Sequence, residues 1–141
     1  MSKTAVGYHI HQLLKKQVII SVQNIFTQYK SNETSRQYRF SKLIHALKII
    51  EESGVVEYLE NELTPKCVIL FGSFAKAEYH SGSDIDIFVQ SSEQSINLKK
   101  FEKKLLHEIN LFFEPDLNKL SPELLNNIIN GIKLKGYLKL K

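Results

Sequence analysis

The sequence predicts an α/β (α+β) fold, a small mixed sheet with packed helices, preceded by an N-terminal helix-hairpin extension. Three observations support this prediction. Residues 67–71 (CVILF) form an apolar run between Pro65 and Gly72, which is typical of a buried strand. Residues 84–89 and 109–113 are apolar enough to form two further strands. The helical segment between them gives a crossover of the length that favours neighbouring positions in one sheet.

Helical periodicity predicts the elements that surround these strands. Apolar residues recur at helical spacing in five segments, which span residues 3–17, 36–53, 55–63, 95–108 and 122–130. Gly54 separates the second segment from the third, because glycine readily forms a left-handed cap. Ser121 and Pro122 are a cap and a first-turn proline at the start of the last helix. A final strand is expected over residues 132–140, with a bulge or kink at Gly136.

The composition is that of one ordinary domain with a small appendage. The chain has 141 residues, of which 43% are hydrophobic and 24% charged, which argues against disorder. It has no long uncharged apolar run and no signal-peptide core, so we expect no membrane span, no export and a cytoplasmic protein. The single cysteine, Cys67, falls within a predicted buried strand and is expected to be a small core residue.

Positive charge is concentrated in the N-terminal third of the chain. Residues 1–50 contain eight Lys or Arg and one acid, Glu33, whereas the remainder contains eleven basic and fourteen acidic residues. Such asymmetry favours an anionic partner for this segment, and nucleic acid is the commonest one. A solvated helix surface explains the same charges equally well, and the sequence leaves both interpretations open.

A predicted helix over residues 3–17 precedes an alternating segment, residues 18–29, in which Gln23 and Asn24 are expected to form a polar turn. Residues 1–34 therefore resemble the recognition helix and wing of a winged helix-turn-helix domain. We expect a truncated remnant of such a domain without its supporting helices, and the resemblance implies DNA as a candidate partner. The apolar stripe of this remnant must then be covered by the rest of the chain or by a second copy in a homodimer. The polar link 31–35 is taken as the boundary to a second domain, residues 35–141.

The segment from Gly72 to Asp86 has the parts of a phosphate and metal site. After the buried strand, Gly72 allows close approach of a ligand to the backbone, and the Ser73 hydroxyl can donate a hydrogen bond. A helix opening at residues 74–77 would leave its first N–H groups free for a phosphate. Asp84 and Asp86 are two residues apart on a predicted strand and therefore share one face. Paired carboxylates facing a phosphate site suit Mg²⁺.

This Gly-Ser pair, followed about ten residues later by Asp-x-Asp, resembles the motif of the nucleotidyltransferase superfamily related to DNA polymerase β, in its small "minimal nucleotidyltransferase" form. The resemblance implies the nucleotidyltransferase fold, with Gly72, Ser73 and Lys76 binding ATP or another nucleoside triphosphate. It also implies that Asp84 and Asp86 are the catalytic carboxylates and hold two Mg²⁺ ions. Ala77 stands where the family commonly has glycine.

The family has a third carboxylate on the next strand, and here the sequence departs from the pattern. Asn110 occupies the expected place in residues 109–112 (INLF). An amide oxygen can ligate a cation, but an amide cannot act as a base. Glu114 shares the strand face of Asn110 and is the other candidate, whereas Asp116, just past Pro115, is a poorer one.

Two functions remain open from the sequence. The first is an Mg²⁺-dependent enzyme that transfers a nucleoside monophosphate to a hydroxyl of a protein, a nucleic acid or a small molecule. Since small members of the family often act as antitoxins that modify a partner toxin, the resemblance favours the protein acceptor. The second is a catalytically weakened or inactive module that keeps the fold and binds DNA or a protein.

Overall fold

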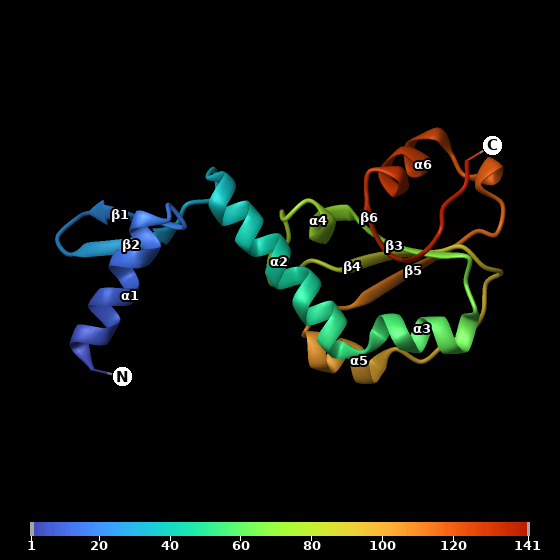
Figure 1. Cartoon of the computed structure of the whole chain (residues 1–141), viewed down its shortest axis with the longest axis horizontal. Helices are drawn as coiled ribbons and strands as arrows, with labels where there is room; N and C mark the ends of the chain where they lie inside the picture. Colours follow the sequence, from blue (N-terminus) through green and yellow to red (C-terminus); the bar gives the residue numbers. More distant parts are fainter. Residues whose placement is uncertain (1, 141) are drawn as a thin grey trace. The chain divides into compact units, whose positions relative to one another are not determined.

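The computed structural model describes residues 2–140, which divide into two compact units (Figure 1). The first unit ends at Ile44 and the second begins at His45, so the division falls inside helix α2 (Arg36–Ser53). The boundary predicted from the sequence, at residue 34, precedes that helix and stays a prediction. Among the described residues, no helix combines the length and the apolar character that crossing a bilayer requires.

The first unit contains helix α1 (Lys3–Lys15) and a two-stranded antiparallel sheet of β1 (Ile19–Gln23) and β2 (Thr27–Ser31). The predicted order of helix and hairpin is confirmed, but the turn differs from the prediction. Gln23 pairs with Thr27, so the turn is residues 24–26 and its tip is apolar rather than polar. The winged-helix resemblance itself stays a prediction.

Helices α2 and α3 (Val55–Leu63) have the predicted bounds. Gly54 separates them in the left-handed conformation, with φ of 81°, which costs glycine little because it has no Cβ. Thr64 closes α3, also in the left-handed conformation. Buried positions of α3 recur on one face, as the apolar spacing predicted: Val55, Val56, Leu59 and Leu63.

The second unit is built on a mixed four-stranded sheet in the order β5-β4-β3-β6. Its strands are β3 (Cys67–Phe71), β4 (Ile85–Val89), β5 (Ile109–Phe113) and β6 (Ile132–Gly136). β3 is antiparallel to both β4 and β6, while β4 and β5 are parallel neighbours. The predicted crossover through α5 (Lys99–Leu105) is therefore confirmed.

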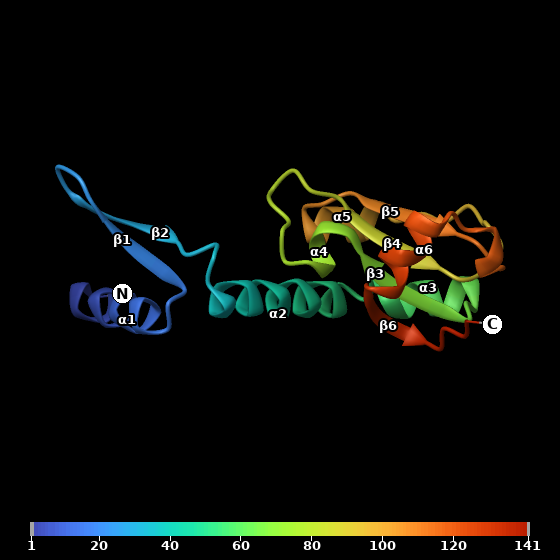
Figure 2. The same cartoon turned by 90° about the horizontal axis from the view of Figure 1, so that it is seen from above.

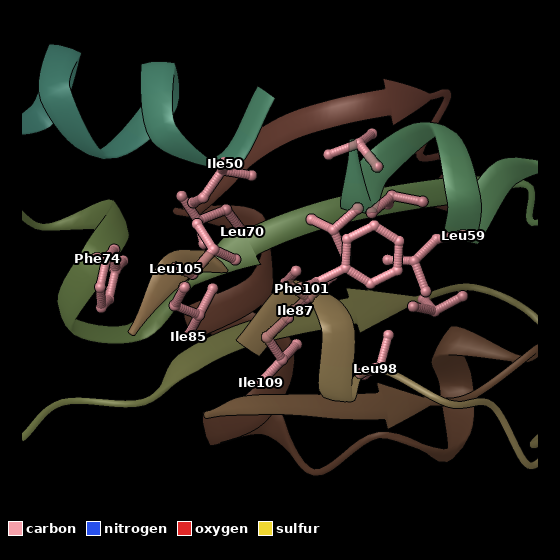
Figure 3. Packing of buried hydrophobic residues seen from close by; sticks show 14 of the residues in the cluster. Ile50, Leu59, Leu70, Phe74, Ile85, Ile87, Leu98, Phe101, Leu105 and Ile109 are labelled. Atoms are coloured by element: carbon pink, nitrogen blue, oxygen red, sulfur yellow. The ribbon is translucent and has the colours of Figure 1, made fainter. Parts of the chain in front are cut away.

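Each face of this sheet packs against helices. On one face, β3 and β4 bury alternate residues against α2, α3 and α5, as Figure 3 shows for Ile50, Leu59, Leu70, Ile87 and Phe101. On the other face, a smaller cluster joins the sheet to a 3₁₀ turn, η1 (Leu117–Lys119), and to α6 (Pro122–Ile129). Both clusters draw their buried residues from Ala46 onward, so the hydrophobic core belongs to the second unit.

Two elements are shorter than their apolar patterns predict. α5 covers seven residues rather than the predicted fourteen, although Leu98, Phe101 and Leu105 are buried as expected. β6 ends at Gly136, whose φ of 74° turns the chain out of the sheet. A register shift in the β3–β6 pairing lies between Val68 and Ile69. β6 is the edge strand, as its alternating lysines predicted.

Candidate nucleotide and metal site

The two aspartates lie where β4 begins. Asp84 immediately precedes the strand and is exposed, and Asp86 is its second residue and half-buried. The intervening Ile85 and the following Ile87 are fully buried on the opposite face. Because neighbouring strand residues alternate between faces, burial of the two isoleucines directs both carboxylates to the same side of the sheet.

Asn110 lies beside both carboxylates. It pairs with Asp86 in the parallel register of β4 and β5, and its Nδ2 donates to Asp84 Oδ2 and to Asp86 Oδ1, at 3.2 Å each. The amide thus uses both of its N–H groups on the aspartates. The two carboxylate oxygens converge on a single polar atom, and this donor stabilises two charges that would otherwise repel each other.

Gly72 forms the other wall of this site. Gly72 directly follows Phe71, the last residue of β3, which pairs with Asp86 of β4. The backbone of Gly72 is left-handed, with φ of 69°. A Cβ at this position would overlap Asp86 Oδ2 and lie 3.2 Å from Asp86 Cγ. Glycine is therefore required both by the left-handed backbone and by the closeness of the carboxylate.

The chain continues from Gly72 into a single helical turn, α4 (Gly72–Ala75). The turn starts two residues earlier than predicted and does not extend beyond Lys76, whose backbone N–H bonds to Gly72 O and Phe74 O and whose side chain is exposed. Ser73 is half-buried within the turn. Ala77 leaves it with φ of 58°, the left-handed conformation that favours glycine, which agrees with the glycine that the family resemblance implies at this position.

Comparison with known proteins identifies this fold. The family model described as "Polymerase beta, Nucleotidyltransferase" matches residues 54–137, which is more than half of the chain and includes Gly72, Asp84, Asp86 and Asn110.

The chain belongs to the polymerase β nucleotidyltransferase family. Membership implies nucleotidyltransferase-type chemistry, with a nucleoside triphosphate as substrate and typically a divalent cation. A solved structure described as "Crystal structure of the toxin-antitoxin with AMP-PNP" matches with a TM-score of 0.45 and 26% identity, over 60% of this chain and 73% of that chain. No match was found among the curated proteins.

A histidine that the sequence analysis did not single out contacts the residue before Asp84. His107 Nδ1 lies 2.6 Å from Ser83 O, directly before Asp84. Its ring meets Phe74 edge to face at 4.9 Å, and Phe74 stacks on Tyr79 at 4.1 Å. His107 thereby joins α4, the loop before β4 and the start of β5. No local pattern reveals this role, because Ser83 is 24 residues away.

The other candidates for the third carboxylate of the family motif lie elsewhere. Glu114 follows the far end of β5, about 13 Å along the strand from Asn110, and its Oε1 accepts from the backbone N–H of Asp116 at 2.9 Å. Asp116 Oδ1 accepts from Asn118 N at the start of η1. In residues 2–140 no three or more His, Cys, Asp or Glu side chains gather as a metal site.

The donors beside Gly72 nevertheless fit a divalent cation. Asp84 and Asp86 present carboxylate oxygens, the ligands that Mg²⁺ prefers, and Mg²⁺ commonly takes one or two carboxylates and completes its shell with water and phosphate. Since a positively polarised amide already sits between these oxygens at 3.2 Å from each, the position is one where positive charge is stabilised.

Proposed function

We propose that this protein transfers a nucleoside monophosphate from ATP, or another nucleoside triphosphate, to a hydroxyl acceptor in an Mg²⁺-dependent reaction. One observation carries the proposal: Asp84 and Asp86 converge on a single polar atom beside the bare backbone of Gly72. A triphosphate needs both a cation and an approach free of side chains, and this arrangement offers the two together.

Each residue then has a defined role. Asp84 and Asp86 would hold the cation, and the amide oxygen of Asn110 would be available as a further ligand. Gly72, the Ser73 hydroxyl and the Lys76 ammonium orient the triphosphate. When bound, Mg²⁺ neutralises the phosphate oxygens and the pyrophosphate that leaves. The proposal includes the two-ion site that the family resemblance implies, with Asn110 in place of the third carboxylate.

The acceptor and the setting are also proposals. We infer a protein hydroxyl as acceptor, so that the protein would act as an antitoxin by modifying a partner toxin. A cytoplasmic location would supply ATP and Mg²⁺. The exposed apolar residues of α1, among them Val6 and Tyr8, would be covered by such a partner or by a second copy in a homodimer.

A second function is favoured by Asn110. An amide cannot take a proton from an attacking hydroxyl at neutral pH, so the site could bind a nucleotide without transferring it. In that case the protein would be a regulatory binding module that keeps the nucleotidyltransferase fold.

Calorimetry with ATP, in the presence and absence of Mg²⁺, tests the site. We expect Mg²⁺-dependent binding by the wild type and at least about tenfold weaker binding by Asp84→Asn and by Asp86→Asn, since each loses a charged ligand. Asp116→Asn is the matched control, because Asn keeps the oxygen that accepts from Asn118 N. Equal heats for all four proteins would refute the proposed site.

Transfer of label from α-phosphate-labelled ATP separates the two functions. Label on a protein or nucleic-acid acceptor, lost in Asp86→Asn, supports the enzyme. Mg²⁺-dependent binding with no transfer to any acceptor from the native cell extract supports the binding module.

A further inference from the structure

The tip of the β1–β2 hairpin is the most exposed apolar feature of the first unit. Ile25 is 92% and Phe26 78% exposed, in a turn closed by a hydrogen bond from Asn24 N to Phe26 O. Figure 2 shows this turn standing clear of α1. Single exposed apolar residues are ordinary, but an adjacent Ile-Phe pair at the end of an arm is typical of a surface that inserts into a partner.

The base of the same hairpin is basic. Up to Ile44 the chain contains seven Lys or Arg and one acid, which leaves twelve basic and fourteen acidic residues for the rest. Lys15 and Lys16 line a shallow hollow of about 280 Å³ between the end of α1 and the first turns of α2. Lys30 adds a charge on β2 itself. The partner of this unit is therefore expected to be strongly anionic.

Hydrogen bonds join the segment that follows α1 to the segment that precedes α2, at the base of the hairpin. Gln17 O accepts from Asn32 Nδ2 at 3.0 Å and from Ser35 Oγ at 2.7 Å, and Asn32 N donates to Val18 O at 2.9 Å. Five residue pairs separate the base from the turn, a length of about 15 Å. The grooves of duplex DNA are about 7.5 to 8.5 Å deep, so an arm anchored at the phosphates reaches the bases.

The ribbon is also exposed on both faces. All five residues of β2 are exposed, and three of the five in β1. A flat protein interface would cover one face of such a ribbon, whereas a nucleic-acid groove contacts both faces and the tip. Together with the charge, this exposure favours duplex DNA over an acidic protein.

We propose that the β1–β2 hairpin is a DNA-binding arm. Lys15, Lys16 and Lys30 contact phosphates, while Ile25 and Phe26 enter the minor groove and wedge between two base pairs, which kinks the duplex. The proposal is independent of the nucleotidyltransferase site, and DNA binding by this arm requires neither ATP nor Mg²⁺.

Fluorescence anisotropy of the full chain with a labelled 20-base-pair duplex, over a series of salt concentrations, tests the proposal. The double variant Lys15→Ala/Lys16→Ala should reduce the slope of log K against log salt by about 2, since each lost phosphate contact removes about one unit. The control Lys103→Ala/Lys119→Ala removes two exposed lysines of the second unit and should leave the slope unchanged.

The tip is tested by Ile25→Ser/Phe26→Ser. We expect binding about tenfold weaker or more with the salt slope unchanged, because a stacked aromatic contact is lost but no charge, and loss of duplex bending measured by energy transfer between the duplex ends. Leu106→Ser, at a residue 82% exposed in the second unit, is the control. The melting temperature of the tip variant, measured by circular dichroism, should equal that of the wild type.

Three results would overturn the proposal. They are no measurable duplex binding by the wild type, effects of the tip variant no larger than those of Leu106→Ser, and a tip variant that changes a dimer into a monomer in sedimentation while duplex binding stays unchanged. The last result would assign the tip to a contact between two copies of the chain.

Discussion

Asn110 donates to both aspartates of the candidate site. Asn110→Asp would place a third carboxylate against two others and remove the amide hydrogen bonds. Without metal, we expect the variant to be destabilised by about 1 to 3 kcal/mol, and we expect Mg²⁺ to raise its melting temperature more than that of the wild type. Melting with and without Mg²⁺ measures both effects.

The control for this substitution is Asn127→Asp, which adds the same charge at an exposed position of α6. If Mg²⁺ stabilised both variants equally, Asn110 would have no part in a metal site. Label transfer that increases in Asn110→Asp would show that the missing base limits the wild type.

Gly72 combines a left-handed backbone with a close approach to the side chain of Asp86. Gly72→Ala forces both a left-handed alanine and an overlap with Asp86, so we expect a loss of about 2 kcal/mol or more and loss of ATP binding. Gly54→Ala has the same backbone constraint, but its Cβ would meet nothing within 4 Å, so it should lose about 1 kcal/mol and keep binding. Urea unfolding measures the free energy of unfolding, and calorimetry measures ATP binding. If Gly72→Ala and Gly54→Ala lost the same stability and bound ATP equally well, the close approach of Gly72 to Asp86 would be contradicted.

Cys67 provides a pH-dependent contribution to stability. Burial raises the pKa of its thiol, and the charge of Lys133 opposes this only in part. The folded state therefore keeps its proton above about pH 8.5, the ordinary pKa of a cysteine, where the unfolded chain loses it. The contribution is fully present below that pH and is lost as pH rises toward the folded pKa. In urea unfolding, the free energy of unfolding of the wild type should fall relative to that of Cys67→Ala between about pH 8 and 10. If the difference between the two free energies stayed constant over this range, the thiol would make no such contribution.

Two helices are followed by a residue in a strained, left-handed backbone conformation. Ala77 follows α4 with φ of 58°, and Leu106 ends α5 with φ of 59°. A left-handed L-residue costs about 1 to 2 kcal/mol, and glycine recovers most of it after its own entropy loss. Ala77→Gly and Leu106→Gly should each raise the free energy of unfolding by up to about 1 kcal/mol. Ala75→Gly, inside the helical turn, should lower it, and thermal unfolding that ranked Ala75→Gly above Ala77→Gly would contradict the assignment.

At the scale of the whole molecule, stability resides in the second unit. No residue from 2 to 45 is buried, and the two hydrophobic clusters begin at Ala46 and at Cys67. A fragment of residues 35–141 should therefore unfold cooperatively in urea, with a free energy within about 1 kcal/mol of the full chain. Loss of the cooperative transition would show that the first unit completes the core.

Much of the second unit was predictable because its signals are local. Helices and strands begin or end at residues with strong local preferences, namely Gly54, Pro65 and the Ser121-Pro122 pair. The predicted bounds of α2, α3, β3 and β5 match the structure. α5 was predicted too long, since apolar spacing continues past the residues that adopt helical geometry. The hairpin turn was misplaced because polar residues favour turns in general, whereas cross-strand pairing put Ile25 and Phe26 there.

The sequence by itself determined that two aspartates share a strand face and that a glycine follows a buried strand, since both depend on the two-residue period of a strand and on neighbours in the chain. Only the tertiary structure decided what stands next to them. The register of β4 against β5 brought Asn110 between the carboxylates, the pairing of β3 with β4 set Gly72 against Asp86, and His107 reached Ser83. These contacts join residues 14 to 26 positions apart, and a strand register shifted by one residue would turn each side chain to the other face.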